Sequence, residues 1–233
     1  MSGRLIAIGD IHGCLDAFLA LLEAISPQPE DRIVTLGDYI DRGPDSRGVI
    51  EQLILLAGRC RLIPLLGNHE EMMLLVRDGR DWLLEDWLAF GGAATLASYG
   101  CETPEGIPKQ HVAFLQRCAA LYAPEEKWFF VHASYLADLP LDEQPCWALR
   151  WQSIRVSPPE PHCSGRTAIV GHTSQKDGRI LDLGHLKCID TCCYGDKWLT
   201  ALEVQAGRIW QADPRGRLRV GNWETMIDAV KRG

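Results

Sequence analysis

The segment Gly37-Asp38-Tyr39-Ile40-Asp41-Arg42-Gly43 follows a short apolar run, residues 32–36, whose composition is typical of a buried β-strand. Four more turns that carry polar side chains also follow apolar runs: Gly9-Asp10-Ile11-His12-Gly13, Gly67-Asn68-His69-Glu70, Val131-His132-Ala133 and Gly171-His172. Loops that leave the carboxyl ends of neighbouring strands in an open α/β sheet converge on one crevice. We therefore expect the five turns to form a single site.

The first third of the chain alternates between strand and helix patterns. Residues 5–8 and 32–36 predict strands, and residues 15–25 carry apolar side chains at helical spacing. A strand, a helix and a second strand predict a parallel pair joined by a right-handed crossover. The unit repeats with a helix at 49–57 and a strand at 62–66, so the fold class is α/β.

The remainder of the chain predicts helices followed by strands. Residues 71–121 are expected to be mainly helical, and their tryptophans, among them Trp82 and Trp87, to pack rather than to bind a ligand. Strands are expected at 128–131, 167–170, 186–189, 199–204 and 208–211, with antiparallel pairs among the later ones. We expect one domain over residues 1–215 and a C-terminal tail over 216–233, with a short helix at 222–231 capped by Asn222.

Charge and cysteine usage exclude several classes of protein. The net charge of -7 over 233 residues argues against a general nucleic-acid or anionic-membrane binder. The nine cysteines include no C-x-x-C spacing, so we expect reduced thiols rather than a disulfide framework or a zinc ribbon. The first residues lack a signal-peptide pattern, and no apolar run approaches the roughly 20 residues of a membrane span. The sequence therefore predicts a soluble cytoplasmic protein, of undetermined oligomeric state.

The polar residues of the five turns have the chemistry of a two-metal phosphoesterase. Carboxylate, amide and imidazole groups without a thiolate favour Mn, Fe or Zn, with Mn²⁺ preferred, over a closed structural zinc site. Two divalent cations bring four positive charges, and two carboxylates and one bridging hydroxide return three. The remaining positive charge faces an incoming phosphate, and metals about 3.5 to 4 Å apart can clamp its attacking and leaving oxygens.

Three residues beside the expected ligands suit the remaining chemistry. The guanidinium of Arg42 can contact phosphate oxygens in a bidentate manner. His69 is suited to protonate the leaving alkoxide. Asp41 could hold the His69 ring and stabilise its cation. The turns thus predict phosphate binding and acid catalysis in one place.

The order of these motifs resembles the phosphoprotein phosphatase (PPP) family of metallophosphoesterases, and most closely its short bacterial and phage members of the lambda-phosphatase type. The resemblance covers about residues 4–205. It implies a calcineurin-like fold, in which mixed β-sheets pack as a sandwich flanked by α-helices. Two departures from the family pattern are Ser134 after His132-Ala133 and Cys192 in place of a glycine.

By position, the resemblance implies Asp10, His12 and Asp38 as ligands of one metal ion, and Asp38, Asn68, His132 and His172 as ligands of a second. It implies His69, paired with Asp41, as general acid, and substrate contacts from Arg42, Asn68 and a second arginine. Trp147-Ala148-Leu149-Arg150 makes Arg150 the preferred second arginine, with Arg155 and Arg166 as alternatives. Glu70 is expected to bond the backbone of its turn, and His111, His162 and His185 are expected to lie outside the site.

The expected activity is hydrolysis of phosphoserine and phosphothreonine in proteins, with phosphotyrosine as a further option, by direct attack of a metal-bridging hydroxide. A phosphorylated protein or peptide is then the expected partner. The alternative is a symmetrical dinucleoside tetraphosphate hydrolase, a group whose members typically lack the aspartate of Asp-Arg-Gly and carry Gly-Asn-His-Asp. Asp41 and Glu70 favour the phosphatase on this criterion. A binding module without catalysis is disfavoured, because all six expected ligands are present.

Overall fold

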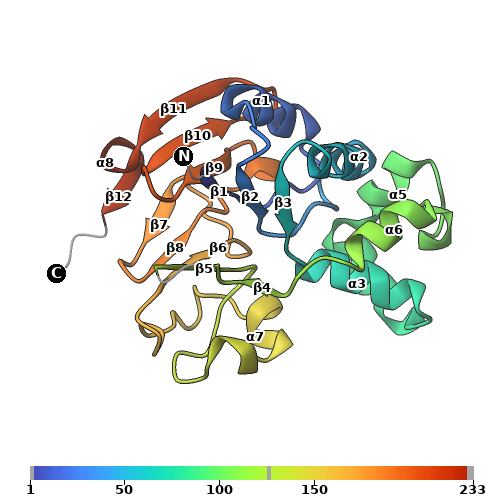
Figure 1. Cartoon of the computed structure of the whole chain (residues 1–233). Coiled ribbons are helices and arrows are strands. Elements are labelled where there is room, and N and C mark those ends of the chain that lie inside the picture. The colour runs from blue at the N-terminus through green and yellow to red at the C-terminus, as the bar shows by residue number, and fades with distance from the viewer. Residues whose placement is uncertain (1–2, 125–126, 230–233) are drawn as a thin grey trace.

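The computed structural model describes residues 3–124 and 127–229, which form two mixed β-sheets packed against each other (Figure 1). The first sheet has the order β11 (Leu218–Asn222), β10 (Arg208–Ala212), β9 (Leu199–Glu203), β1 (Leu5–Ile8), β2 (Arg32–Thr35) and β3 (Arg61–Pro64). The second has the order β12 (Ile227–Ala229), β7 (Ile180–Asp182), β8 (Leu186–Cys188), β6 (Thr167–Val170), β5 (Trp128–Val131) and β4 (Leu121–Tyr122). The expected α/β sandwich is confirmed.

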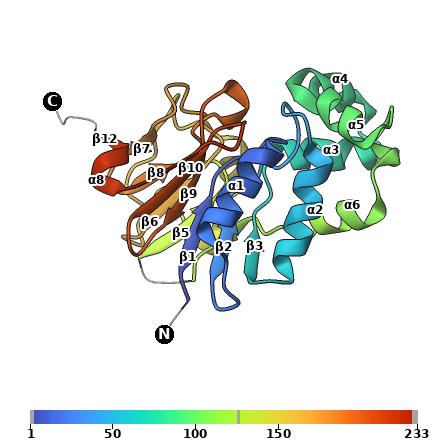
Figure 2. The ribbon, with the colours of Figure 1, turned by 90° about the horizontal axis from the view of Figure 1, so that it is seen from above.

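Helices flank the sandwich, and α1 and α2 cover the outer face of the first sheet (Figure 2). The α-helices are α1 (Leu15–Ile25), α2 (Ser46–Ala57), α3 (Asn68–Arg77), α4 (Leu84–Trp87), α5 (Ala93–Tyr99), α6 (Lys109–Leu115), α7 (Cys146–Trp151) and α8 (Trp223–Met226). The mainly helical character predicted for residues 71–121 is confirmed. In the part of the chain that the structure describes, no helix combines the length and apolarity that a membrane crossing requires.

The cores on the two faces of the first sheet follow from alternation along its strands. Leu5 and Ala7 of β1 contact the apolar side chains of the second sheet, whereas Ile6 and Ile8 pack against the helices. Successive side chains of a strand point to opposite faces, so a fully apolar strand such as β1 can fill two cores at once. On the second sheet, Phe130 points into the sandwich.

Strand direction brings the predicted turns to one edge. β1, β2 and β3 are parallel to one another, as are β5, β6 and β8. The predicted parallel pair of 5–8 with 32–36 and the predicted antiparallel pairing of the later strands, seen between β9 and β10, are both confirmed. The carboxyl ends of three parallel strands of the first sheet and of two parallel strands of the second therefore carry the polar turns.

The C-terminal segment differs from the sequence prediction. β11 pairs along β10, so the first sheet continues past residue 215. The helix predicted for 222–231 is too long: α8 ends at Met226, and residues 227–229 pair with β7, whose edge offers backbone partners that a short helix lacks. The amide oxygen of Asn222 does accept a bond from the Thr225 N–H, at 3.2 Å. Residues 230–231 of that prediction lie outside the described residues.

Candidate metal centre

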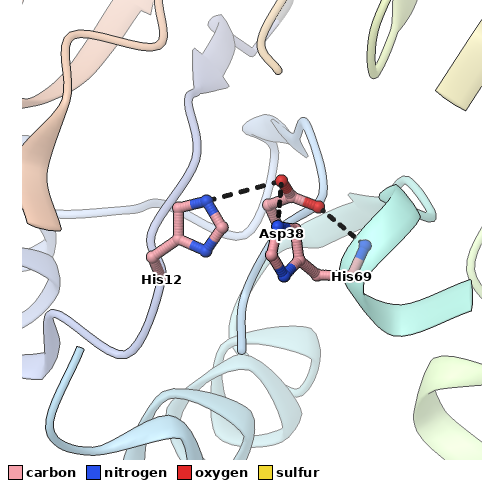
Figure 3. Close-up of side chains that lie close together, drawn as sticks. All are labelled: His12, Asp38 and His69. Carbon is pink, nitrogen blue, oxygen red and sulfur yellow. Dashed lines mark hydrogen bonds and ion pairs between the residues drawn. The ribbon is translucent and has the colours of Figure 1, made fainter. Parts of the chain in front are cut away.

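Asp38, in the turn after β2, lies at the centre of the cluster. Its carboxylate oxygens are 3.4 Å from Nε2 of His12, 3.4 Å from Nε2 of His132 and 3.9 Å from Nε2 of His69. Figure 3 shows this carboxylate between His12 and His69. The side chains form two groups that can hold a metal ion, one of His12, Asp38 and His69 and one of Asp38, His132 and His172. Asp38 belongs to both, which is the property of a bridging ligand.

The spacing of these donors fits divalent cations. Two ligand atoms that lie 2.0 to 2.2 Å from the same ion are about 3.0 to 3.5 Å from each other. The Asn68 amide oxygen has this spacing to both histidines of the second group: 3.1 Å to Nε2 of His132 and 3.0 Å to Nδ1 of His172. The Asn68 oxygen and the two imidazole nitrogens therefore converge on one point, where a cation can bind.

Asp10 supplies an independent observation that fits a cation at this site. One of its carboxylate oxygens accepts a bond from the His172 N–H at 2.9 Å, but the other is buried without a hydrogen-bond partner. Burial, followed by the carboxylates of Asp190 and Asp38, raises the pKa of Asp10 well above its usual range. An adjacent cation would satisfy the orphaned oxygen and reverse this shift.

The histidines are held in the form that can bind a metal. Nδ1 of His12 donates to the Ile40 carbonyl at 2.8 Å, and Nδ1 of His132 donates to the Leu36 carbonyl at 2.7 Å. A carbonyl can only accept, so each Nε2 keeps a lone pair that faces Asp38. Burial lowers the pKa of His12 and His132, and it lowers the pKa of His172 to about 4. All three rings are therefore neutral at pH 7.

His69 differs from the other histidines because a second carboxylate contacts it. Its Nδ1 lies 2.6 Å from Asp41, and both side chains are buried. Burial alone would lower the pKa of His69, but the carboxylates of Asp38 and Asp41 outweigh burial and raise it. His69 is thus the histidine of the cluster that best keeps a proton, although its Nε2 also faces Asp38.

Asp41 has partners that sequence analysis did not identify. The Trp87 indole N–H donates to it at 3.0 Å, and the Thr95 hydroxyl donates to it at 2.6 Å. The spacing of Trp82 and Trp87 predicted two packed residues: the full burial of Trp87 confirms one, whereas Trp82 is 73% exposed and that prediction was wrong. The spacing did not predict the hydrogen bond from Trp87 to a residue 46 positions away. No local signal distinguishes Thr95 from other helical threonines.

Glu70 supports the turns from behind. Its carboxylate accepts bonds from the backbone N–H groups of Asp38, Tyr39, Ile40 and Gly67, at 2.8 to 3.2 Å. The predicted structural role is therefore confirmed. Burial, followed by the Asp38 carboxylate, raises the pKa of Glu70 to about 8, against the effect of its backbone donors. Gly67 is required here, because a Cβ at this position would lie 2.2 Å from the Asp38 carboxylate.

Two arginines predicted to bind phosphate lie near the cluster. Arg42 donates to Nε2 of His12 at 2.5 Å, and its guanidinium lies 4.5 Å from the centre of the Tyr194 ring. Tyr194 also packs against His12, with ring centres 5.0 Å apart, and no sequence pattern indicates this role. Arg150, on α7, donates to Glu71 at 2.6 Å. The alternative Arg155 instead donates to the Ser174 carbonyl at 2.6 Å.

Two packed mixed sheets that direct such a cluster of carboxylates and neutral histidines to one edge define a metallophosphoesterase. The chain belongs to the calcineurin-like phosphoesterase family, whose model matches residues 3–156. The expected family and fold are confirmed by this match. A divalent metal requirement follows from the family, and the His and Asp groups described above can meet it.

Curated relatives carry a more specific name. A symmetrical bis(5'-nucleosyl)-tetraphosphatase of Acidovorax sp. (strain JS42) is 45% identical over 76 residues, which are 32% of this chain and 26% of that protein. The enzyme of the same name from Yersinia pestis (strain Pestoides F) is 42% identical over 73 residues, 31% of this chain and 25% of that protein. The match thus spans about a quarter of the length of these relatives.

Solved structures show the same fold across almost the whole chain. A structure described as a candidate diadenosine tetraphosphatase has a TM-score of 0.65 at 22% identity and covers 95% of this chain and 94% of its own. A cold-active protein tyrosine phosphatase has a TM-score of 0.68 at 18% identity, with 94% and 79% covered. At these identities the similarity establishes the fold alone.

The expected protein phosphatase activity and the expected phosphoprotein partner are both wrong, because the curated relatives are tetraphosphatases with nucleotide substrates. The criterion that favoured the phosphatase rested on Asp41 and Glu70. Both side chains are fully buried; Glu70 bonds the backbone, and Asp41 bonds His69, Trp87 and Thr95. The contacts of both carboxylates within the protein hold the turns and the His69 ring.

Proposed function

We propose that this protein is a metal-dependent hydrolase that cleaves symmetrical dinucleoside tetraphosphates, such as diadenosine tetraphosphate, into two nucleoside diphosphates. The observation that carries the proposal is the 45% identity over 76 residues to a symmetrical tetraphosphatase. The buried carboxylates and neutral histidines at the strand ends supply the chemistry that such a reaction needs.

The proposed ligands are those that the strand ends bring together. Asp10, His12 and Asp38 would hold one ion, and Asp38, Asn68, His132 and His172 would hold the other. Oxygen and imidazole donors without a thiolate suit Mn, Fe or Zn, and Mn²⁺ is the ion that we propose. When bound, two such ions would supply positive charge to the phosphate oxygens and lower the pKa of water.

Arg42 is proposed to bind the phosphate chain. In the structure its guanidinium donates to the lone pair of His12 that a cation would take. Once that lone pair is occupied, the same donors are available to phosphate oxygens, while Tyr194 still supports the guanidinium from one side. Asn68 and Arg150 would add further contacts to the substrate.

His69 is proposed as the general acid. The carboxylates of Asp38 and Asp41 raise its pKa, so the ring holds a proton that it can give to the leaving diphosphate oxygen. Asp41 fixes the orientation of the ring through Nδ1 and stabilises its cationic form. The proton to be transferred is then on Nε2, the nitrogen that faces Asp38.

The test is hydrolysis of diadenosine tetraphosphate after removal of metal by a chelator and restoration with Mn²⁺, Fe²⁺ or Zn²⁺. Anion-exchange chromatography should show ADP as the only nucleotide product, and cleavage should be lost without metal. A phosphoserine peptide serves as the comparison substrate. AMP and ATP as products would refute symmetrical cleavage, and faster turnover of the peptide than of the dinucleotide would refute the proposed substrate class.

A further inference from the structure

The last residue of α7 places an aromatic ring next to the candidate metal centre. The N–H of Ala133, the residue after the proposed ligand His132, donates to the Leu149 carbonyl of α7 at 2.7 Å, and Trp151 lies two residues after Leu149. Its side chain nevertheless remains 41% exposed. Helices α7 and α3, which meet at this point, are seen in the lower half of Figure 1. A large ring is thus both near the site and open to a ligand.

One carboxylate holds this ring together with a neighbouring cation. The Trp151 indole N–H donates to one oxygen of Glu71 at 2.5 Å, and Arg150 donates to the other oxygen at 2.6 Å. Glu71 lies in the first turn of α3, two residues after His69. The bond from its N–H to Glu71 fixes the indole in place while the residue stays 41% exposed. Trp151, Glu71 and Arg150 thus form one wall of the site. Because this wall is already held in place, it does not have to become ordered when a ligand binds.

The Arg150 guanidinium has capacity for a second partner. Its Nε is buried without a hydrogen bond, and its side chain is only 11% exposed. A guanidinium has five N–H donors, so the bond to Glu71 leaves others available for phosphate oxygens. The wall therefore combines a phosphate-binding group and a stacking surface within two consecutive residues.

We propose that Trp151 is a stacking platform for the nucleobase of one nucleoside diphosphate half of the substrate, with Arg150 on the adjoining phosphates; this assignment rests on the proposed function. A substrate cut at its central phosphate bond places a diphosphate and then a nucleoside on each side of the reaction. The Trp151 ring beside the Arg150 guanidinium matches one such half, which has a nucleobase and a diphosphate. Aromatic stacking accepts any base, because each base has a π face.

The test measures binding of ADP and of inorganic diphosphate to the metal-loaded full-length protein by titration calorimetry. Trp151→Ala should weaken ADP binding by about 5- to 100-fold more than it weakens diphosphate binding. Trp151→Phe should restore most of the difference, since it keeps a ring. Trp82→Ala is the matched control: Trp82 is 73% exposed and follows α3, whose ten residues extend about 15 Å away from Asn68.

Each outcome decides whether Trp151 is a stacking platform for a nucleobase or a packing residue. Equal losses for ADP and diphosphate, or no loss for ADP, would overturn the platform and leave Trp151 as a packing residue. The same conclusion holds if the wild-type protein binds ADP no more tightly than diphosphate. If ADP binding depends on Trp151 while diadenosine tetraphosphate is not cleaved, the platform stands and the proposed function fails.

Discussion

Replacement of Trp87 by phenylalanine tests how the interior of the helical region supports Asp41 and the proposed general acid His69. The Trp87 indole is fully buried, and its N–H donates to both carboxylate oxygens of Asp41, at 3.0 and 3.2 Å. The ring has no spare room, because a Cβ on Gly92 would lie 2.5 Å from it. Phenylalanine keeps an aromatic ring in the space but removes the donor.

The expected cost has two parts. A hydrogen bond to a charged group contributes about 1.5 to 3 kcal/mol. The smaller ring also leaves part of the indole volume empty, which costs about 1 to 2 kcal/mol where the surroundings cannot collapse. Together, Trp87→Phe should lower the free energy of unfolding by about 2.5 to 5 kcal/mol. It should also lower kcat, since Asp41 is held less firmly against Nδ1 of His69.

Urea unfolding of the metal-free protein, followed by far-ultraviolet circular dichroism, measures the loss without a contribution from metal binding. Trp82→Phe is the control, because it makes the same chemical change at a side chain that is 73% exposed, where a change within about 0.5 kcal/mol is expected. If the two variants differ by less than about 1 kcal/mol, the bond from Trp87 to Asp41 does not support this region and the reasoning is wrong.

Other substitutions test the site and the scaffold. His69→Asn should lower kcat by about 10² to 10⁴ with metal content unchanged by mass spectrometry, whereas loss of metal would make His69 a ligand. Tyr194→Leu should raise the KM for diadenosine tetraphosphate about 2- to 30-fold, because it removes the aromatic ring whose centre lies 4.5 Å from the Arg42 guanidinium. Burial alone would raise the pKa of Asp31, but bonds from the Arg4 guanidinium and from backbone N–H groups hold it below its usual range. Asp31→Asn should therefore destabilise the protein by about 1.5 to 3 kcal/mol at pH 7, and in urea titrations this difference should shrink as the pH falls below about 4.

The sequence was sufficient to place the polar turns, because their position depends on local order. Each proposed ligand follows a strand within a few residues, so the ends of parallel strands determine where Asp38, His132 and His172 can lie. Strand and helix periods likewise gave the bounds of β1 and α1 correctly. Predictions succeed here because each feature is encoded within a short stretch of the chain.

The features that the sequence did not reveal depend on contacts between distant segments. The bond from Thr95 to Asp41 joins residues 54 positions apart, and Tyr194 reaches Arg42 from the opposite end of the chain. β12 forms only because the edge of β7 is present to receive it. The substrate prediction was wrong for a related reason: it rested on Asp41 and Glu70, which are buried residues of the motifs, whereas the proposed substrate contact Trp151 lies outside them.

The two groups of metal-binding side chains draw on the sheets differently. The proposed ligands of one ion, Asp10, His12 and Asp38, all follow strands of the first sheet, whereas the second ion would join Asp38 and Asn68 to His132 and His172, which follow strands of the second sheet. An ion bound by the second group would therefore link the two β-sheets, and its binding energy would stabilise their packing against each other. By the same linkage, a substitution that loosens the packing of Leu5 and Phe130 inside the sandwich should weaken the affinity for this second ion more than the affinity for the first ion.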